Sequence, residues 1–179
     1  MTPKWGTSHL VELKELLQEY PELVEEAGKL YEQHLFGETF MNCLHVTEGS
    51  QEFLQYLSTH YTLALATGVH PKLLKERIMP QFHIPQVFTQ IMTGYDLADH
   101  TKGKPDPYIA QTIMKEQGFL PEETIMVGDA KNDVLMAQHA GITPIVVLTG
   151  HLTRQEAEKL GVKYIIEDVT KLETVLTQL

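Results

Sequence analysis

Two carboxylates stand at the end of an apolar run in residues 127–137 (VGDAKNDVLMA), which hold Asp129 and Asp133. Asp129 falls where a strand pattern ends and Asp133 in the first turn of the helical pattern that follows, so both side chains can point toward one crevice. Carboxylate oxygens suit a hard cation such as Mg²⁺. In the competing interpretation Asp129 caps the helix and Asp133 complements its dipole. Taken alone, the spacing slightly favours this structural interpretation.

Two further polar groups follow apolar runs, at the strand ends where ligands of an open parallel sheet gather. Thr67 and Gly68 follow the run YTLALA, and a hydroxyl beside free backbone amides suits an anion. Lys104 precedes Pro105 in KGKPDP, where the fixed proline geometry holds the ammonium in place for a phosphate. Each group also has an ordinary interpretation: Thr67 as a strand-end turn residue and Lys104 as a solvated loop lysine.

Short apolar runs that alternate with helical patterns position these groups. The runs are YTLALA, TQIMT, TIMV, PIVVL and YIIE. Their alternation with segments of period near 3.6 predicts an α/β fold, a parallel sheet flanked by helices, and their nearly continuous apolar character predicts burial of both sheet faces. Thr153 with Glu156 and Thr170 with Glu173 have the spacing of capping boxes, which predicts where the last two helices begin.

The beginning of the chain has a different pattern. Residues 8–20 and 22–40 read as two helices broken at Pro21, with no strand pattern between them. We therefore expect a helical lobe in residues 1–45 and an α/β core in residues 46–179.

Composition excludes several classes of function. A length of 179 residues allows one domain with a small appendage. The formal net charge of −10, with no cluster of basic residues, argues against a nucleic-acid partner. The single cysteine, Cys43, excludes an internal disulfide, and with no signal-peptide pattern we expect a cytoplasmic protein. The apolar runs are far shorter than the roughly twenty residues that a membrane span needs.

The order and spacing of Thr67, Lys104, Asp129 and Asp133 resemble those of the haloacid dehalogenase-like superfamily, especially its phosphoglycolate-phosphatase-like branch. The resemblance runs from about residue 47 to the C-terminus, and the stretches EGSQEFLQYLS and AQHAGI share it. It implies a Rossmann-like parallel sheet with a helical cap.

For chemistry, the resemblance implies Mg²⁺-dependent hydrolysis of a small phosphorylated metabolite through an aspartyl phosphate. Thr67 and Gly68 would bind the phosphoryl group, and Lys104 would neutralise phosphate and nucleophile. Asp129 would ligate Mg²⁺, and Asp133 would support the water shell of the metal. Dehalogenase and phosphomutase chemistry are alternatives on the same scaffold, and the similarity to the phosphatase branch favours a phosphatase.

One part of the family pattern has no counterpart, the strand ending in DxDxT whose first aspartate is the nucleophile. No aspartate precedes Asp96, and the stretch DLADHT that begins there has the wrong spacing and reads as a solvated loop. We expect the chain to begin inside the cap, to lack the central strand between YTLALA and TIMV, to bind Mg²⁺ weakly or not at all, and to be inactive as written. The two flanking strands would close on each other, or a partner chain or refolded segment would fill the slot.

Three functions remain open. The first is an N-terminally short version of a phosphatase. The second is a non-catalytic protein that binds phosphate or a phospho-ligand, and the third is a nonfunctional fragment that self-associates through its open sheet.

Overall fold

The computed structural model describes residues 9–179, the side chains of residues 9–11 excepted. Residues 1–8 of the predicted lobe thus lie outside the described residues. All five predicted strands are confirmed: β1 (Leu63–Thr67), β2 (Phe88–Thr93), β3 (Ile125–Gly128), β4 (Thr143–Val147) and β5 (Tyr164–Ile166). Every ladder between them is parallel. The fold is therefore α/β, as the sequence predicts.

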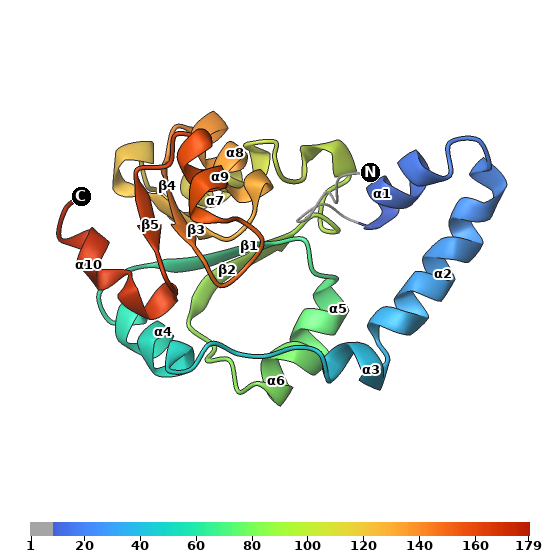
Figure 1. Ribbon diagram of the computed structural model, residues 1–179, viewed down its shortest axis with the longest axis horizontal. Helices are drawn as coiled ribbons and strands as arrows, with labels where there is room; N and C mark the ends of the chain where they lie inside the picture. The colour runs from blue at the N-terminus through green and yellow to red at the C-terminus, as the bar shows by residue number, and fades with distance from the viewer. Residues whose placement is uncertain (1–8) are drawn as a thin grey trace.

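The strands form two separate sheets (Figure 1). One has the order β1-β2 and the other the order β3-β4-β5. β1 and β3 do not pair, so the predicted alternative in which these two strands close on each other is wrong. No other strand within residues 9–179 lies between them. β1 and β3 contain no fully buried residue, whereas the last three residues of β4 are buried. Each of the two strands therefore has one edge without a ladder partner in the described part of the chain.

Two apolar clusters join the sheets through side chains. The first lies around Ile109 of α7 (Tyr108–Gln117) and Met136 of α8 (Lys131–Ala140), and Ala66 of β1 and Met126 of β3 pack against it. The second contains Leu57 of α4 (Ser50–Ser58), together with Leu63 of β1 and with Ile125 and Val127 of β3. Because alternate residues of a strand point to opposite faces, the two clusters cover opposite faces of β3.

The remaining helices flank the strands. Between β1 and β2 run α5 (Pro71–Leu73), the π-helical turn η2 (Leu74–Ile78) and α6 (Met79–Gln81). The 3₁₀ turns η3 (His100–Lys102) and η4 (Pro121–Glu123) lie on either side of α7, and α9 (Arg154–Lys159), η5 (Val169–Lys171) and α10 (Glu173–Leu176) complete the chain. Among the described residues, no helix has the length and apolar character that crossing a membrane requires.

One of the two predicted capping boxes is confirmed. Thr153 accepts a hydrogen bond from the Glu156 amide at 3.3 Å, and the Glu156 carboxylate accepts one from the Thr153 amide at 2.9 Å. The second predicted capping box, Thr170 with Glu173, is wrong. The Asp168 carboxylate occupies the capping position instead and accepts a hydrogen bond from the Thr170 amide at 2.8 Å. Glu173 instead accepts a hydrogen bond from the Tyr56 hydroxyl. A carboxylate two residues earlier in the chain starts the turn, which leaves Thr170 inside it.

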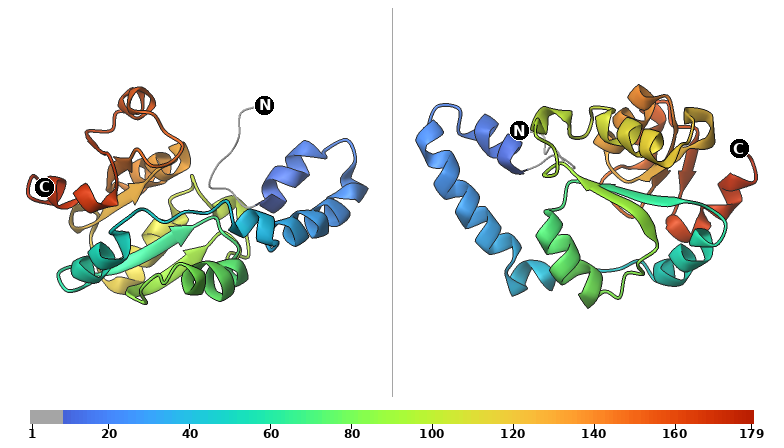
Figure 2. Two further views of the ribbon diagram at one scale, coloured as in Figure 1. Left: turned by 60° about the horizontal axis from the view of Figure 1, so that its bottom comes forward. Right: turned by 180° about the vertical axis from the view of Figure 1, so that it is seen from behind.

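The helical lobe extends from one side of the molecule, away from α10 (Figure 2). It comprises α1 (His9–Leu16), η1 (Pro21–Leu23), α2 (Val24–Leu35) and α3 (Glu38–Met41), so the predicted break at Pro21 is confirmed and the second predicted helix is divided in two. Arg77 of η2 ties the lobe to the core, since it donates to the Phe36 carbonyl at 3.0 Å and to the Glu38 carboxylate at 2.6 Å.

Candidate active site

Thr67 ends β1, as the sequence predicts, and lies in register with Thr93 of β2. Its hydroxyl oxygen accepts a hydrogen bond from the Val69 amide at 3.1 Å. The bond uses the oxygen as an acceptor, so the hydroxyl can still donate its own proton. Gly68 is the next residue and is half-buried. The end of β1 thus presents a hydroxyl donor at the carboxyl edge of the smaller sheet.

Lys104 and Asp133 form a buried ion pair. The Lys104 Nζ lies 2.7 Å from Asp133 Oδ1, and each side chain is only 8% exposed. The other carboxylate oxygen, Oδ2, accepts from the amides of Asp129 at 3.2 Å and Ala130 at 3.1 Å. The interpretation of Lys104 as a solvated loop lysine is therefore wrong. Asp133 thus accepts hydrogen bonds from backbone amides at the start of α8, as its structural interpretation predicted, and also binds Lys104.

Asp129 has a different environment. Its side chain is 41% exposed, and its Oδ2 lies 4.0 Å from the Nε2 of His151. The helix-cap position belongs to Ala130, so the interpretation of Asp129 as the cap of α8 is wrong. The amides at the start of the helix are hydrogen-bonded to Asp133 and do not use the carboxylate of Asp129. The Asp129 carboxylate is therefore available to a ligand.

Sequence reasoning missed Gly150 and His151, which follow β4 and lie against Asp129. Both stand just beyond the run PIVVL, so the strand-end rule that selected Thr67 would also have selected this loop.

The predicted site residues are only partly brought together. Asp129, Asp133 and Lys104 form one hydrogen-bonded group at the end of β3. Thr67 belongs to the other sheet and has no hydrogen bond to that group in the described part of the chain. The distance between the two sheets, set by the apolar clusters, therefore determines how far the hydroxyl stands from the charged group.

The fit of these residues to Mg²⁺ is partial. Within residues 12–179 no three Asp, Glu, His or Cys side chains gather closely enough to hold a metal ion. Mg²⁺ commonly takes one or two carboxylates, with water and phosphate oxygens completing its octahedron. Asp129 offers one available carboxylate, whereas both oxygens of Asp133 are already hydrogen-bonded within the protein.

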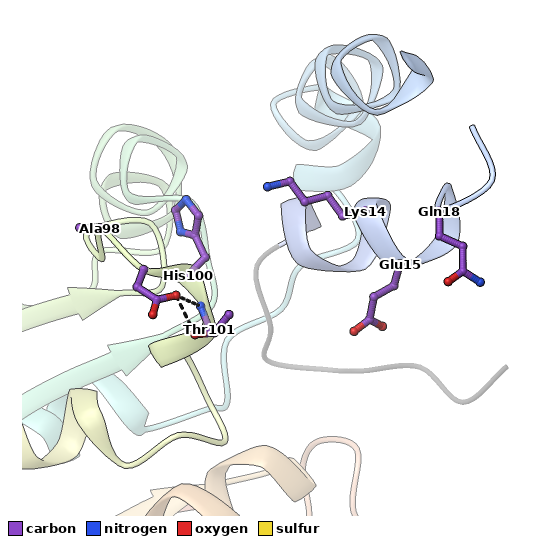
Figure 3. Close-up of a pocket in the computed structure, with 7 residues that line it drawn as sticks. Lys14, Glu15, Gln18, Ala98, His100 and Thr101 are labelled. Atoms are coloured by element: carbon purple, nitrogen blue, oxygen red, sulfur yellow. Dashed lines mark hydrogen bonds between the residues drawn. The ribbon is translucent and has the colours of Figure 1, made fainter. Parts of the chain in front are cut away.

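A cavity of about 530 Å³ opens between α1 and the loop after β2 (Figure 3). Lys14, Glu15 and Gln18 line one wall, and residues 98–101 line the other. In that loop the Asp99 carboxylate accepts hydrogen bonds from the hydroxyl and the amide of Thr101, which lower the pKa of Asp99. None of the predicted site residues lines the cavity, so it is a separate opening between lobe and core.

The acidic stretch DLADHT is only in part the solvated loop that the sequence predicts, because Leu97 within it is buried in the cluster around Ile109. Asp96 and Asp99 are exposed, and Asp96 accepts hydrogen bonds from the amide and the hydroxyl of Thr93 at 2.8 and 2.9 Å. Both carboxylates thus hold local turns together at exposed positions on either side of the buried Leu97.

Residues 9–147 match the sequence model of the family described as haloacid dehalogenase-like hydrolase. The chain belongs to this family. Among curated relatives of this haloacid dehalogenase-like chain, the phosphoglycolate phosphatase of Aliivibrio fischeri is 27% identical over 131 residues, which cover 73% of this chain and 56% of that protein. The pyrophosphatase PpaX of Oceanobacillus iheyensis is 32% identical over 93 residues, or 52% of this chain and 42% of that protein. These relatives confirm the predicted resemblance to the phosphoglycolate-phosphatase-like branch.

Solved structures confirm the haloacid dehalogenase-like fold. A predicted phosphatase from Clostridium acetobutylicum superposes with a TM-score of 0.76 at 21% identity, over 97% of this chain and 79% of that one. A hydrolase from Pseudomonas syringae gives a TM-score of 0.76 at 24% identity, over 98% and 80% of the two chains. The chain spans little more than half the length of the first curated relative, 56% of it.

Proposed function

We propose that this chain is the phosphate-handling part of a haloacid dehalogenase-like phosphomonoesterase that acts on a small phosphorylated metabolite with Mg²⁺. One observation carries the proposal: a buried Lys104–Asp133 pair is hydrogen-bonded to the backbone amide of Asp129, whose own carboxylate is 41% exposed at the carboxyl end of β3. The names of the relatives, phosphoglycolate phosphatase and pyrophosphatase, support a phosphorylated substrate.

Each residue has a distinct task in this proposal. Thr67 donates its hydroxyl proton to a phosphoryl oxygen, and the Gly68 amide contributes a second donor. Lys104 supplies a fixed positive charge, and Asp133 holds that ammonium in place. Asp129 would hold Mg²⁺, which when bound neutralises the charge on the phosphoryl oxygens. Preorganised charges and donors of this kind carry most of the catalysis in phosphoryl transfer.

We further propose that the 179 residues as printed are inactive by the aspartyl-phosphate route. The sequence has no aspartate before Asp96, and in the described part of the chain no third metal-binding side chain joins Asp129 and Asp133. Asp129 is thus the single available carboxylate, with no second one to share the metal, so Mg²⁺ binding is expected to be weak.

The second candidate function is a non-catalytic protein that binds phosphate or a phospho-ligand. The unused donor capacity of the Thr67 hydroxyl, together with the buried positive charge of Lys104, favours it, because neither group needs a nucleophile to hold an anion. Residues 1–45 would act as a partial cap over the core, and the cavity between α1 and residues 98–101 supports a selective role for this lobe.

A titration with inorganic phosphate tests both candidates. Thr67→Val keeps the shape of the side chain and removes the hydroxyl, so phosphate should bind about tenfold more weakly, the cost of one hydrogen bond to a charged group. Thr62→Val is the matched control, since Thr62 is exposed and lies before the opposite end of β1. Calorimetry without saturable heat in the unmodified chain would reject both candidates.

The same preparations should show no turnover of an aryl phosphate in Mg²⁺ above that of the Asp129→Asn variant. Turnover that depends on Asp129 would contradict the proposed inactivity and would mean that another group supplies the nucleophile.

The unpaired edges of β1 and β3 also lead us to propose self-association, because open strand edges are templates for pairing with another chain. A monomer by sedimentation velocity at both low and high concentration would count against it. The single cysteine and the acidic charge support a cytoplasmic location without nucleic-acid partners.

A further inference from the structure

The loop after β4 is bound to the backbone of Asp129. The amides of His151 and Leu152 both donate to the Asp129 carbonyl, at 3.2 and 2.9 Å. These two bonds hold residues 149–152 against the residue whose carboxylate is available to a ligand.

Gly150 lies directly on the side chain of Asp129. Its φ is outside the left-handed region, so an L residue could adopt its backbone conformation. A Cβ at this position, however, would come closer than 3.0 Å to the Cβ, Cγ and Oδ2 of Asp129. Rotation about χ1 of Asp129 moves Cγ and Oδ2 but leaves Cβ in place. Space, and not backbone conformation, therefore requires a glycine here.

Gly128 has the same relation to Asp133. A Cβ there would lie 2.7 Å from both Cγ and Oδ2 of Asp133 and would also overlap its Cβ. The Asp133 carboxylate cannot turn away without breaking its bonds to Lys104 and to two backbone amides. Gly118 and Gly161 differ, because both have a positive φ and a Cβ on either would meet nothing within 4 Å.

We infer that Gly128 and Gly150 are positioning residues, whose bare backbones form the surfaces on which the carboxylates of Asp133 and Asp129 lie. The inference gives Asp129 two supports, the strand β3 that it directly follows and the loop after β4. The geometry is independent of the proposed function; only the consequence for Mg²⁺ binding rests on that function.

A stability cycle tests the contact between Gly150 and Asp129. Gly150→Ala is made in the unmodified chain and in three backgrounds, Asp129→Asn, Asp129→Ala and Asp129→Gly, and each protein is unfolded in urea. We expect a midpoint loss of about 1 M in the unmodified chain and an equal loss with Asp129→Asn, which keeps the side-chain shape. The loss should shrink with Asp129→Ala and vanish with Asp129→Gly, where no Cβ is left to overlap.

Gly103→Ala is the matched control, since a Cβ there would lie 3.3 Å from its nearest neighbour, the His100 carbonyl oxygen. Its smaller effect should be the same in every background. If Gly150→Ala costs as much with Asp129→Gly as in the unmodified chain, the inference is overturned.

The affinity of the folded protein for Mg²⁺ alone is a second measurement, and a change in stability does not affect it. Titration followed by the amide resonance of Asp129 should show an affinity about tenfold lower in folded Gly150→Ala than in the unmodified chain, and an unchanged affinity would overturn the positioning role. If the unmodified chain shows no Mg²⁺-dependent shift, the metal part of the proposed function fails, while the stability cycle still decides the contact itself.

Discussion

Lys104→Met is expected to lower the free energy of unfolding by about 3 kcal/mol, because it leaves the buried Asp133 carboxylate without its counter-charge. Methionine is one heavy atom shorter than lysine but keeps an unbranched apolar stem, so the loss measures the ammonium more than the packing. Asp133 retains its bonds to the amides of Asp129 and Ala130, which keeps the expected loss at the lower end for a broken buried pair. Urea unfolding followed by circular dichroism gives the value.

Lys102→Met is the matched control two residues earlier. Lys102 is 47% exposed and its Nζ lies 3.6 Å from Asp106, so its removal should cost less than about 1 kcal/mol. A double variant, Lys104→Met with Asp133→Asn, should be more stable than the sum of the single losses predicts, since neither charge is then buried alone. Equal losses for Lys102→Met and Lys104→Met would contradict the burial of the Lys104–Asp133 pair.

Ile109→Ala is expected to lower the free energy of unfolding by about 4 kcal/mol. Ile109 is 0% exposed and belongs to the cluster that receives Ala66 and Met92 from one sheet and Met126 from the other. β1 and β3 share no backbone ladder, so the side chains of this cluster help to hold the two sheets together, as hydrogen bonds do within a continuous sheet. A cavity here should therefore loosen the two sheets from each other as well as weaken the core.

Ile113→Ala offers the same chemical change one turn further along α7, at a partly buried position of the same cluster. Its cost should be clearly smaller, because less of the removed surface was shielded from water. Phosphate binding should also weaken in Ile109→Ala and not in Ile113→Ala, since Thr67 stands on one sheet and Lys104 is paired with Asp133 at the end of the other. Equal losses of stability for the two variants would show that the joint between the sheets lies elsewhere.

The sequence by itself determined the strands, the first capping box, and the order of Thr67, Lys104, Asp129 and Asp133 along the chain. These features depend on short-range patterns: apolar runs, a turn residue at a strand end, a threonine three residues before a glutamate. Such patterns act within a few residues of themselves, so they can be read without knowing the fold. The order of the four residues was also specific enough to point to the family that the comparisons then confirmed.

Only the tertiary structure decided which of these residues meet. Lys104 looks like a loop lysine in the sequence, and its burial against Asp133 appears only when α7 and α8 pack together. The contact between Gly150 and Asp129 joins the loops after β4 and β3, and the failure of β1 to pair with β3 separates Thr67 from the charged group. Partners, burial and pairing of this kind join residues that are distant in the chain, and no local pattern encodes them, because their free energy comes from the packing of the whole core.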